Sequence, residues 1–187
     1  MKPLAAIMGS AACAWDDFAA AEALLATAGR KWDAIIAANS IGVECPTLDY
    51  WVTLHPELLA EWQAARDAKP EYSPVGRVVA HRKISTGEPP ARLDDVREYR
   101  FRDQTTTGSS GLFAVKVTMA EGVKRIILCG MPMTPSIHRD DGKPWVHYNS
   151  FTKAWTDMLW RISPTTRSMS GWTRQILGHP EFEWLRN

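Results

Sequence analysis

Short apolar runs alternate with longer amphipathic stretches along most of the chain. The runs have strand length and are almost entirely aliphatic, which is typical of parallel strands covered on both faces. We predict strands at 2–8, 33–38, 49–53, 75–80, 125–129 and 165–169. Helical patterns fall at 16–29, 56–67, 112–122 and 149–161, and a short last helix follows Ser170 and Gly171. This alternation predicts one α/β domain over residues 1–187, a three-layer sandwich with a mainly parallel, Rossmann-like sheet.

Two stretches break this pattern. Residues 81–103 contain Pro89 and Pro90, many arginines and few aliphatic side chains. We predict an irregular connection there that carries one exposed or edge strand near 99–101. Residues 131–145 are expected to form a loop, because three prolines and a glycine interrupt any regular element.

The most specific local signal lies between Thr105 and Gly130. A loop of small residues, 107–111, precedes a helix, and a buried strand follows that ends in Gly130. Glycines at 108 and 111 lack a β-carbon, so a ligand could approach the backbone there, and the free amides of a helix start favour an anion. The pattern therefore indicates phosphate or nucleotide binding. The alternative is a tight turn whose serines only cap the helix.

Small polar residues also follow other predicted strands. Parallel strands place their carboxyl ends on one edge of a sheet, where ligands of such folds bind. The residues that we interpret as nucleotide-binding at this edge are Gly9, Ser10, Asn39, Ser40, Thr107, Gly108, Ser109, Ser110, Gly111 and Gly130. Their coincidence on one edge is more specific than any one cluster alone.

Composition narrows the classes of function. A net charge of +1 over 187 residues implies no broad surface for polyanions, although a nucleic acid is not excluded as an acceptor. No apolar run reaches membrane-spanning length, so no membrane partner is expected. The three cysteines have neither disulfide nor zinc-ligand spacing, and a reducing cytoplasm is the simplest compartment. Most of the nine tryptophans are expected in the core or at a subunit contact of a homo-oligomer, with base stacking as the alternative.

The order of these motifs resembles that of known proteins. Ile-Met-Gly-Ser near the start, Ala-Ala-Asn after the second strand, and Thr-Gly-Ser-Ser-Gly followed by Gly-Val-Lys-Arg-Ile-Ile-Leu-Cys-Gly are similar to motifs of the bacterial sialyltransferases of glycosyltransferase family 42. They also resemble a Rossmann-like group that contains archaeal 6-hydroxymethylpterin pyrophosphokinase and flagellin-modification proteins. The chain further resembles small proteins of phage genomes. The resemblance is strongest at 107–130 and covers the parallel-sheet framework.

The resemblance implies roles for particular residues. In the sialyltransferases the turn that matches Gly9 and Ser10 lies beside the nucleotide, and the asparagine that matches Asn39 reaches it. The loop that matches 109–111 holds the phosphate and sugar of the donor, and Gly130 matches the glycine that ends the strand. The family places an acidic residue after this glycine, whereas this chain has Met131 and Pro132, which weakens the case for CMP–sialic acid as donor.

The resemblance also implies a histidine general base on the segment that follows Gly130. His147 and His138 lie in this segment and are the catalytic candidates. Imidazole titrates near neutral pH, as a general base requires, but each could instead be a surface histidine. His55 is expected at the same edge of the sheet, and we interpret it mainly as a partner of Glu57 in the first turn of a helix.

Two further groups are candidates for phosphate chemistry. Ser170 and Arg174 follow the last predicted strand and could bind a phosphate, while Ser170 could also cap the last helix. Asp140 and Asp141 could hold magnesium on a diphosphate, although two adjacent aspartates are more often a turn. We predict no other metal site, and the expected ligand is a nucleotide or a nucleotide sugar.

These observations leave three functions open. The first is a nucleotide-binding, glycosyltransferase-like enzyme that uses a histidine base. The second is a non-catalytic nucleotide-binding or sequestering module, which the missing acidic residue after Gly130 favours. The third is a metal-dependent pyrophosphoryl transferase, whose activity would require magnesium.

Overall fold

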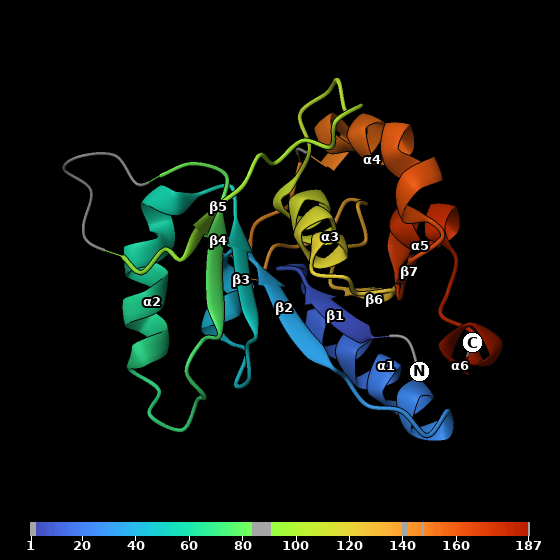
Figure 1. The fold of residues 1–187 in the computed structure, drawn as a ribbon, viewed down its shortest axis with the longest axis horizontal. Coiled ribbons are helices and arrows are strands. Elements are labelled where there is room, and N and C mark those ends of the chain that lie inside the picture. Colours follow the sequence, from blue (N-terminus) through green and yellow to red (C-terminus); the bar gives the residue numbers. More distant parts are fainter. Residues whose placement is uncertain (1–2, 84–90, 140–141, 147, 187) are drawn as a thin grey trace.

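A computed structural model of the chain describes residues 3–83, 91–139, 142–146 and 148–186. Its strands form one seven-stranded sheet in the order β5-β4-β3-β2-β1-β6-β7, and every pairing between neighbouring strands is parallel (Figure 1). The strands are β1 (Leu4–Met8), β2 (Ala34–Ala38), β3 (Tyr50–Thr53), β4 (Arg77–Ala80), β5 (Asp95–Val96), β6 (Arg125–Cys129) and β7 (Thr166–Ser168). This sheet confirms the predicted Rossmann-like α/β class.

Helices cover both faces of the sheet and complete the three layers (Figure 1). The helices and 3-10 turns are α1 (Ala14–Thr27), η1 (Asn39–Val43), η2 (Pro56–Leu58), α2 (Leu59–Asp67), α3 (Ser110–Ala120), α4 (Tyr148–Ile162), α5 (Gly171–Leu177) and α6 (Phe182–Arg186). Helix α1 is rich in alanine, the best helix former, and Gly29 follows its C-cap with φ +65°. No helix in the described part of the chain is both long and apolar enough to cross a membrane.

Side chains of each central strand alternate between two hydrophobic clusters. In β1, Ala5 and Ile7 pack with α3 and α4, whereas Leu4 and Met8 pack with α1. This period of two explains why the strand reads as a continuous apolar run, since both of its faces are buried. Helix α3 lies between the sheet and α4, so residues on most of its circumference are buried and its pattern is not that of a surface helix.

The order of strands reverses beside β1. The chain first builds β2, β3, β4 and β5 on one side of β1 and then adds β6 and β7 on the other. The carboxyl ends of β1 and β6 therefore form a topological switch point, the place where ligands bind in open parallel sheets. Gly9 follows β1 and Gly130 follows β6 at this point.

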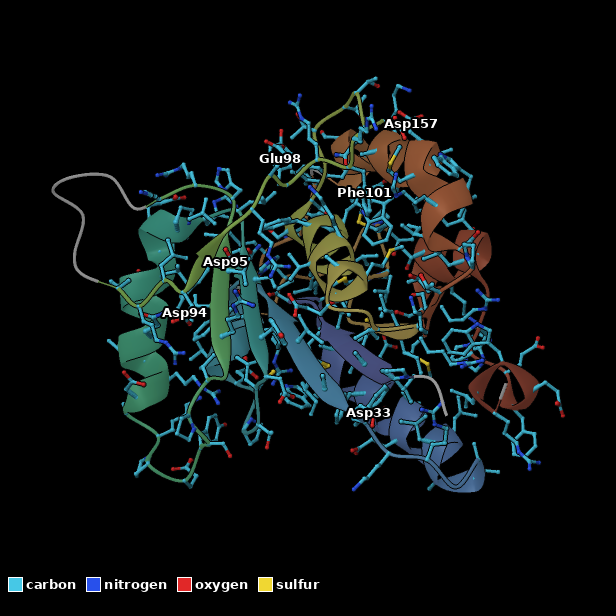
Figure 2. All side chains as sticks on the ribbon, viewed as in Figure 1. Asp33, Asp94, Asp95, Glu98, Phe101 and Asp157 are labelled. Carbon is cyan, nitrogen blue, oxygen red and sulfur yellow. The ribbon has the colours of Figure 1, made fainter. Side chains whose placement is uncertain are left out.

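The edge strand lies at Asp95–Val96 rather than at the predicted 99–101 (Figure 2). Tyr99 and Phe101 alternate as in a strand, but they pack onto the cluster around α3, and Phe101 is buried. The backbone carbonyls of Glu98 and Arg100 accept hydrogen bonds from Nζ of Lys116 on α3 instead of a strand partner. The alternation here reflects packing on a helix.

The chain also ends in one more helix than predicted. Helix α6 follows Pro180 and buries Leu185 completely. Arg30 and Arg125 donate hydrogen bonds to the carbonyl oxygens of Leu185 and Trp184, respectively, and so hold α6 against the body of the protein. A five-residue helix has too little periodicity to be recognised in a sequence.

Candidate functional site

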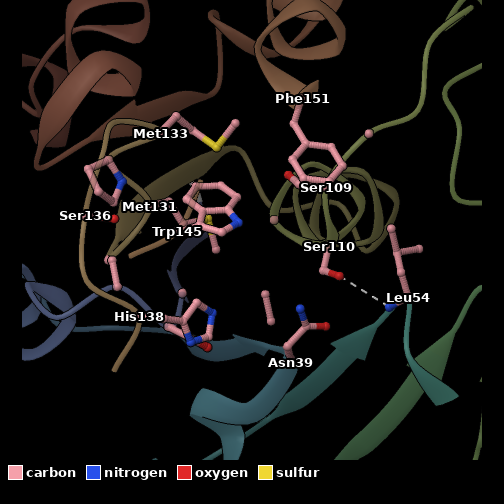
Figure 3. A pocket seen from close by; sticks show the side chains of 18 of the residues that line it. Asn39, Leu54, Ser109, Ser110, Met131, Met133, Ser136, His138, Trp145 and Phe151 are labelled. Atoms are coloured by element: carbon pink, nitrogen blue, oxygen red, sulfur yellow. Dashed lines mark hydrogen bonds between the residues drawn. The ribbon is translucent and has the colours of Figure 1, made fainter. Parts of the chain in front are cut away.

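A cavity of about 490 Å³ lies at the switch point, over the carboxyl ends of β1, β2 and β6 (Figure 3). Every residue predicted to bind nucleotide lines it except Ser40, whose Oγ lies 3.0 Å from that of Ser10, a lining residue. The other lining residues are Ala11, Ala38, Leu54, His55, Met131, Pro132, Met133, Ser136, His138, Trp145, Phe151 and Trp155. The structure thus brings together clusters that are far apart in the sequence.

Gly9 and Gly130 form the floor of the cavity and allow two backbones to meet. Gly130 has φ +71°, and a β-carbon on it would lie 2.6 Å from the Gly9 oxygen and 2.6 Å from Cβ of Ala14. A β-carbon on Gly9 would lie 2.5 Å from the Gly130 oxygen. These glycines are therefore required by the approach of the chain to itself, independently of any ligand.

Asn39 presents an amide group to the cavity from the end of β2. Its φ is +64°, a conformation that asparagine tolerates better than most residues. Its Oδ1 accepts a hydrogen bond of 2.9 Å from Oγ1 of the fully buried Thr53, and its carbonyl accepts one from Nε1 of Trp51. Because Oδ1 is occupied by a donor, the side-chain NH2 is the group that Asn39 offers to a ligand.

The loop before α3 serves partly as a structural cap. Oγ of Ser109 accepts hydrogen bonds from the amide of Leu112 at 3.3 Å and from Nε1 of Trp155 at 3.1 Å. This confirms the capping alternative for Ser109, and its hydroxyl hydrogen remains available as a donor. Oγ of Ser110 lies 3.4 Å from the amide of Leu54.

The two glycines of this loop also make room for side chains of the protein itself. A β-carbon on Gly108 would lie 2.7 Å from Nε2 of Gln104, and one on Gly111 would lie 2.8 Å from the sulfur of Met131. The space that each glycine leaves is therefore filled by a side chain of the protein itself. Both residues still line the cavity, beside the first turn of α3.

Aromatic and aliphatic side chains form the wall opposite Asn39. The rings of Trp145 and Phe151 stack with centroids 6.2 Å apart and an interplanar angle of 19°. Figure 3 shows both rings on one side of the cavity and Asn39 and His138 on the other. None of the described lining residues is an aspartate, glutamate, lysine or arginine. The cavity thus combines an apolar wall with neutral hydrogen-bonding groups.

His138 reaches the cavity from the predicted loop, in which two isolated antiparallel bridges, Ile137 with Pro144 and Ala11 with His138, turn the chain into a short hairpin. The amide of His138 donates to the Lys143 carbonyl at 2.8 Å, and the amide of Arg139 donates to the Ser10 carbonyl at 2.9 Å. The hairpin is therefore attached to the turn after β1. His147, Asp140 and Asp141 lie outside the described residues.

Three residues of the site had no signal in the sequence. Ser136 lines the cavity, and its buried Oγ has no hydrogen-bond partner among the described residues. Met133 also lines it and has φ +49°, so the two non-glycine residues with positive φ in the described part of the chain, Met133 and Asn39, both lie at this cavity. Such backbone strain clusters at functional sites.

Asp17 is the third of these residues and holds the floor of the cavity in place. Its buried carboxylate accepts hydrogen bonds from the amide of Gly130 at 2.8 Å and from Oγ of Ser170 at 2.6 Å. In the sequence, an aspartate at a helix start reads as a partner of the helix dipole. These two partners lie more than a hundred positions away, and nothing local indicates them.

The structure does not bring Ser170 and Arg174 into the cavity. Oγ of Ser170 donates to Asp17, and Ser170 occupies the N-cap position of α5 without a side-chain capping bond. The amides of Trp172 and Thr173 donate to the Pro132 carbonyl, so the chain itself occupies the start of α5. Binding of phosphate by Ser170 and Arg174 stays a prediction.

Comparison with known proteins places the fold. No family model matches the sequence, and no curated protein sequence matches it significantly. Among solved structures, the sialyltransferase CstII from Campylobacter jejuni in complex with the substrate analogue cytidine-5'-monophosphate is similar, with a TM-score of 0.60 and 13% identity over 97% of this chain and 86% of that one. A tyrosine-to-phenylalanine variant of sialyltransferase CST-II in complex with CMP gives a TM-score of 0.61 and 12% identity, over 97% and 88% of the two chains.

These likenesses show that the chain shares the Rossmann-like fold of a sialyltransferase. They agree with the sialyltransferase part of the resemblance found in the sequence, and neither structure represents the pterin pyrophosphokinase part.

Proposed function

We propose that the cavity binds the nucleotide of a nucleotide-sugar donor and that the chain transfers the sugar to an acceptor. The observation that carries this proposal is the position of the cavity. It lies at the switch point of a fold shared with a CMP-binding sialyltransferase, and the residues that match the sialyltransferase motifs line it. Its volume of about 490 Å³ falls within the usual range for small-molecule sites.

The chemistry of the lining fits a nucleotide. The stacked pair Trp145 and Phe151 provides an apolar wall against which a base can pack. The NH2 group of Asn39 is suited to a carbonyl of the base or a ribose hydroxyl. The start of α3 and the hydroxyl of Ser109 supply donors for a phosphate.

Calorimetric titration with CMP, UMP, AMP and GMP tests the binding step. At least one of these nucleotides should bind, and Asn39→Asp should weaken its binding at least about tenfold, because it replaces two donors with an anion. The control Gln175→Glu adds the same charge at an exposed position on α5 and should leave the affinity unchanged. If none of the nucleotides binds to the wild-type protein, the proposal fails.

Donor turnover tests the transfer step. A histidine general base typically contributes about 100- to 10,000-fold in rate. The resemblance nominates His138, which lines the cavity, and His147 for this base. Release of CMP from CMP–sialic acid, followed in wild type, His138→Gln and His147→Gln, should show a loss of rate at constant nucleotide affinity in the variant that lacks the base.

A non-catalytic nucleotide-binding module is the second candidate function. Met131 and Pro132, both buried, follow Gly130 where the sialyltransferases tend to have an acidic residue, and this observation favours binding without chemistry. Tight nucleotide binding without turnover of any CMP-, UDP- or GDP-sugar would support it. Metal-dependent pyrophosphoryl transfer is the third candidate, and its expected magnesium ligands, Asp140 and Asp141, lie outside the described residues. Addition of magnesium and of a chelator to the same assay distinguishes it.

A further inference from the structure

A cluster of ionisable side chains lies where β3 and β4 end, beside the cavity. His55 follows β3 and lines the cavity, and His81 directly follows β4. Between them, Oε1 of Glu57 lies 3.0 Å from Nδ1 of His55, and Oε2 of the same carboxylate lies 2.8 Å from Nη2 of Arg82. An ion pair therefore lies beside the cavity on its β3–β4 side.

The backbone of His55 is fixed by the same network that orients Asn39. The amide of His55 donates to Oγ1 of Thr53 at 2.8 Å, and that hydroxyl donates to Oδ1 of Asn39. Thr53 is fully buried, so the pair of bonds is shielded from water. The side chain of Asn39 and the backbone of His55 are thus held at a fixed distance from each other, on the side of the cavity where a bound ligand would contact Asn39.

The contact with Glu57 determines which nitrogen of His55 can act as a base. A carboxylate accepts a hydrogen bond, so in the neutral imidazole Nδ1 carries the hydrogen and Nε2 keeps its lone pair. The pKa of Glu57 is lowered: partial burial acts to raise it, but hydrogen bonds from its own backbone amide and from His55, with the charge of Arg82, outweigh that. Glu57 therefore stays ionised at neutral pH and stabilises the imidazolium that forms when Nε2 takes a proton.

The geometry points to His55 as the general base of the transfer, with Glu57 as its positioning residue and the β3–β4 side of the cavity as the acceptor side. This inference rests on the proposed function. In the step, the acceptor oxygen bonds to the anomeric carbon while the bond from that carbon to the phosphate oxygen breaks, and the electron pair leaves on the nucleotide. The proton of the acceptor hydroxyl passes to Nε2 of His55. The side chain of His55 is 52% exposed, so an acceptor can reach it.

Three titratable or charged groups surround His55. They are Glu57, which contacts the ring of His55, Arg82, which contacts Glu57, and His81. The pKa of His81 is lowered by burial and by the charge of Arg82, and its buried Nδ1 has no partner among the described residues, so His81 is neutral near pH 7.

Turnover of CMP–sialic acid, with water as acceptor, tests the assignment. His55→Gln should lower the rate at least about 100-fold, while the Kd for CMP changes less than about twofold. Glu57→Gln keeps the size of the side chain and removes its charge, so it should lower the rate, but less than His55→Gln does, because the imidazolium loses a stabilising anion. The controls His179→Gln and Glu61→Gln, which do not line the cavity, should behave as wild type.

Imidazole nitrogen NMR provides a readout without turnover. His55 should show the Nδ1–H tautomer in wild type, and Glu57→Gln should change its tautomer ratio. If His55→Gln retains the wild-type rate while His138→Gln or His147→Gln loses it, the assignment to His55 is wrong and the proposed function survives. If the wild-type protein turns over no CMP-, UDP- or GDP-sugar, the transfer function and the base both fail.

Discussion

The two edges of the same sheet satisfy their polar groups in different ways. At the amino edge, aspartates in the turns accept hydrogen bonds from backbone amides at the beginnings of strands, with distances of 2.8–2.9 Å. The pairs are Asp33 with Leu4, Asp49 with Ile35, and Asp94 with Val78. Figure 2 shows Asp33 and Asp94 at this edge. Each of these carboxylates therefore satisfies a backbone amide at the beginning of a strand.

Ion pairs complete the amino edge. Arg97 contacts Asp95 at 2.6 Å and Glu121 at 2.5 Å, and Tyr50 donates to Glu121 at 3.0 Å. These contacts join the starts of β3 and β5 to the end of α3. The charged side chains of these pairs are thus used to hold the fold together, because each of them contacts an opposite charge or a hydrogen-bond donor.

At the carboxyl edge the described residues that line the cavity include no aspartate, glutamate, lysine or arginine, and they keep spare donors. Asn39 retains its NH2 group and Ser109 its hydroxyl hydrogen, and Oγ of Ser136 has no partner in the described chain. Polar groups that are fixed in place but incompletely paired are those a ligand can satisfy. The residues that line the cavity are therefore distinguished by unused hydrogen-bonding capacity, whereas the polar groups of the amino edge are paired within the chain.

The largest expected effect is on the floor of the cavity. Gly130→Ala should lower the free energy of unfolding by about 3 kcal/mol or more, because it adds backbone strain at φ +71° to close contacts with Gly9 and Ala14. The matched control is Gly122→Ala, with φ +83° and no atom within 4 Å of the new β-carbon. It should cost only about 1–2 kcal/mol. Urea denaturation measures both, and equal losses would mean that the close approach at Gly130 is unimportant.

A smaller loss is expected from opening the amino edge. Asp49→Ala removes the acceptor of the Ile35 amide and should lower the free energy of unfolding by about 2 kcal/mol. Asp49→Asn keeps an acceptor oxygen and should recover much of this loss. Glu71→Ala, at an exposed site, should stay within about 0.5 kcal/mol of wild type. If Asp49→Ala and Glu71→Ala have the same stability, the hydrogen bond from the Ile35 amide to Asp49 does not stabilise the fold.

The sequence predicted most of the fold because the central strands are aliphatic on both faces. Runs such as 125–129 could not be surface elements, and their alternation with helices left few architectures. The prediction of the edge strand failed because a contact with a distant residue overrode the local sequence pattern. Tyr99 and Phe101 resemble a strand, but Lys116 takes the carbonyls that a strand partner would need.

The sequence predicted where the site lies, at the carboxyl edge of the sheet, but not what each of its residues does. Small polar residues after parallel strands must meet at the carboxyl side, so Gly9, Asn39 and Gly130 could be grouped without a structure. Their individual roles could not be, because the contact of Gly130 with Gly9, the bond from Asp17 to Gly130 and the positive φ of Met133 all depend on the folded chain.

Acid should weaken the amino edge more than the cavity. The pKa of Asp95 and that of Glu121 are lowered, chiefly by hydrogen bonds from Arg97. A carboxyl group whose pKa is lower in the folded state stabilises the fold above its ordinary pKa, and this contribution is lost as pH falls toward the lowered value. The Tm should therefore fall below about pH 4.5. Glu121→Gln should lower the Tm at pH 7 slightly, by an amount equivalent to about 1 kcal/mol or less, and should make the loss in acid shallower. A Tm profile parallel to wild type would contradict this origin of the acid sensitivity.

The smallest expected effect is that of salt on nucleotide binding. Between about 0.1 M and about 1 M sodium chloride the Debye length falls from about 10 Å to about 3 Å, so exposed charges lose most of their mutual influence. A phosphate held by amides of α3 and by hydroxyls loses only the helix-dipole contribution of about 0.3–1 kcal/mol, and the Kd for CMP should therefore rise less than about fivefold. Thr107→Arg places a cation on an exposed lining residue and should bind CMP more tightly at low salt, with a steeper loss at high salt. Calorimetry of both proteins tests this prediction. A loss of affinity of more than about tenfold in wild type would mean that a cationic side chain holds the phosphate, and that the hydrogen-bonding groups of the lining are not enough to explain binding.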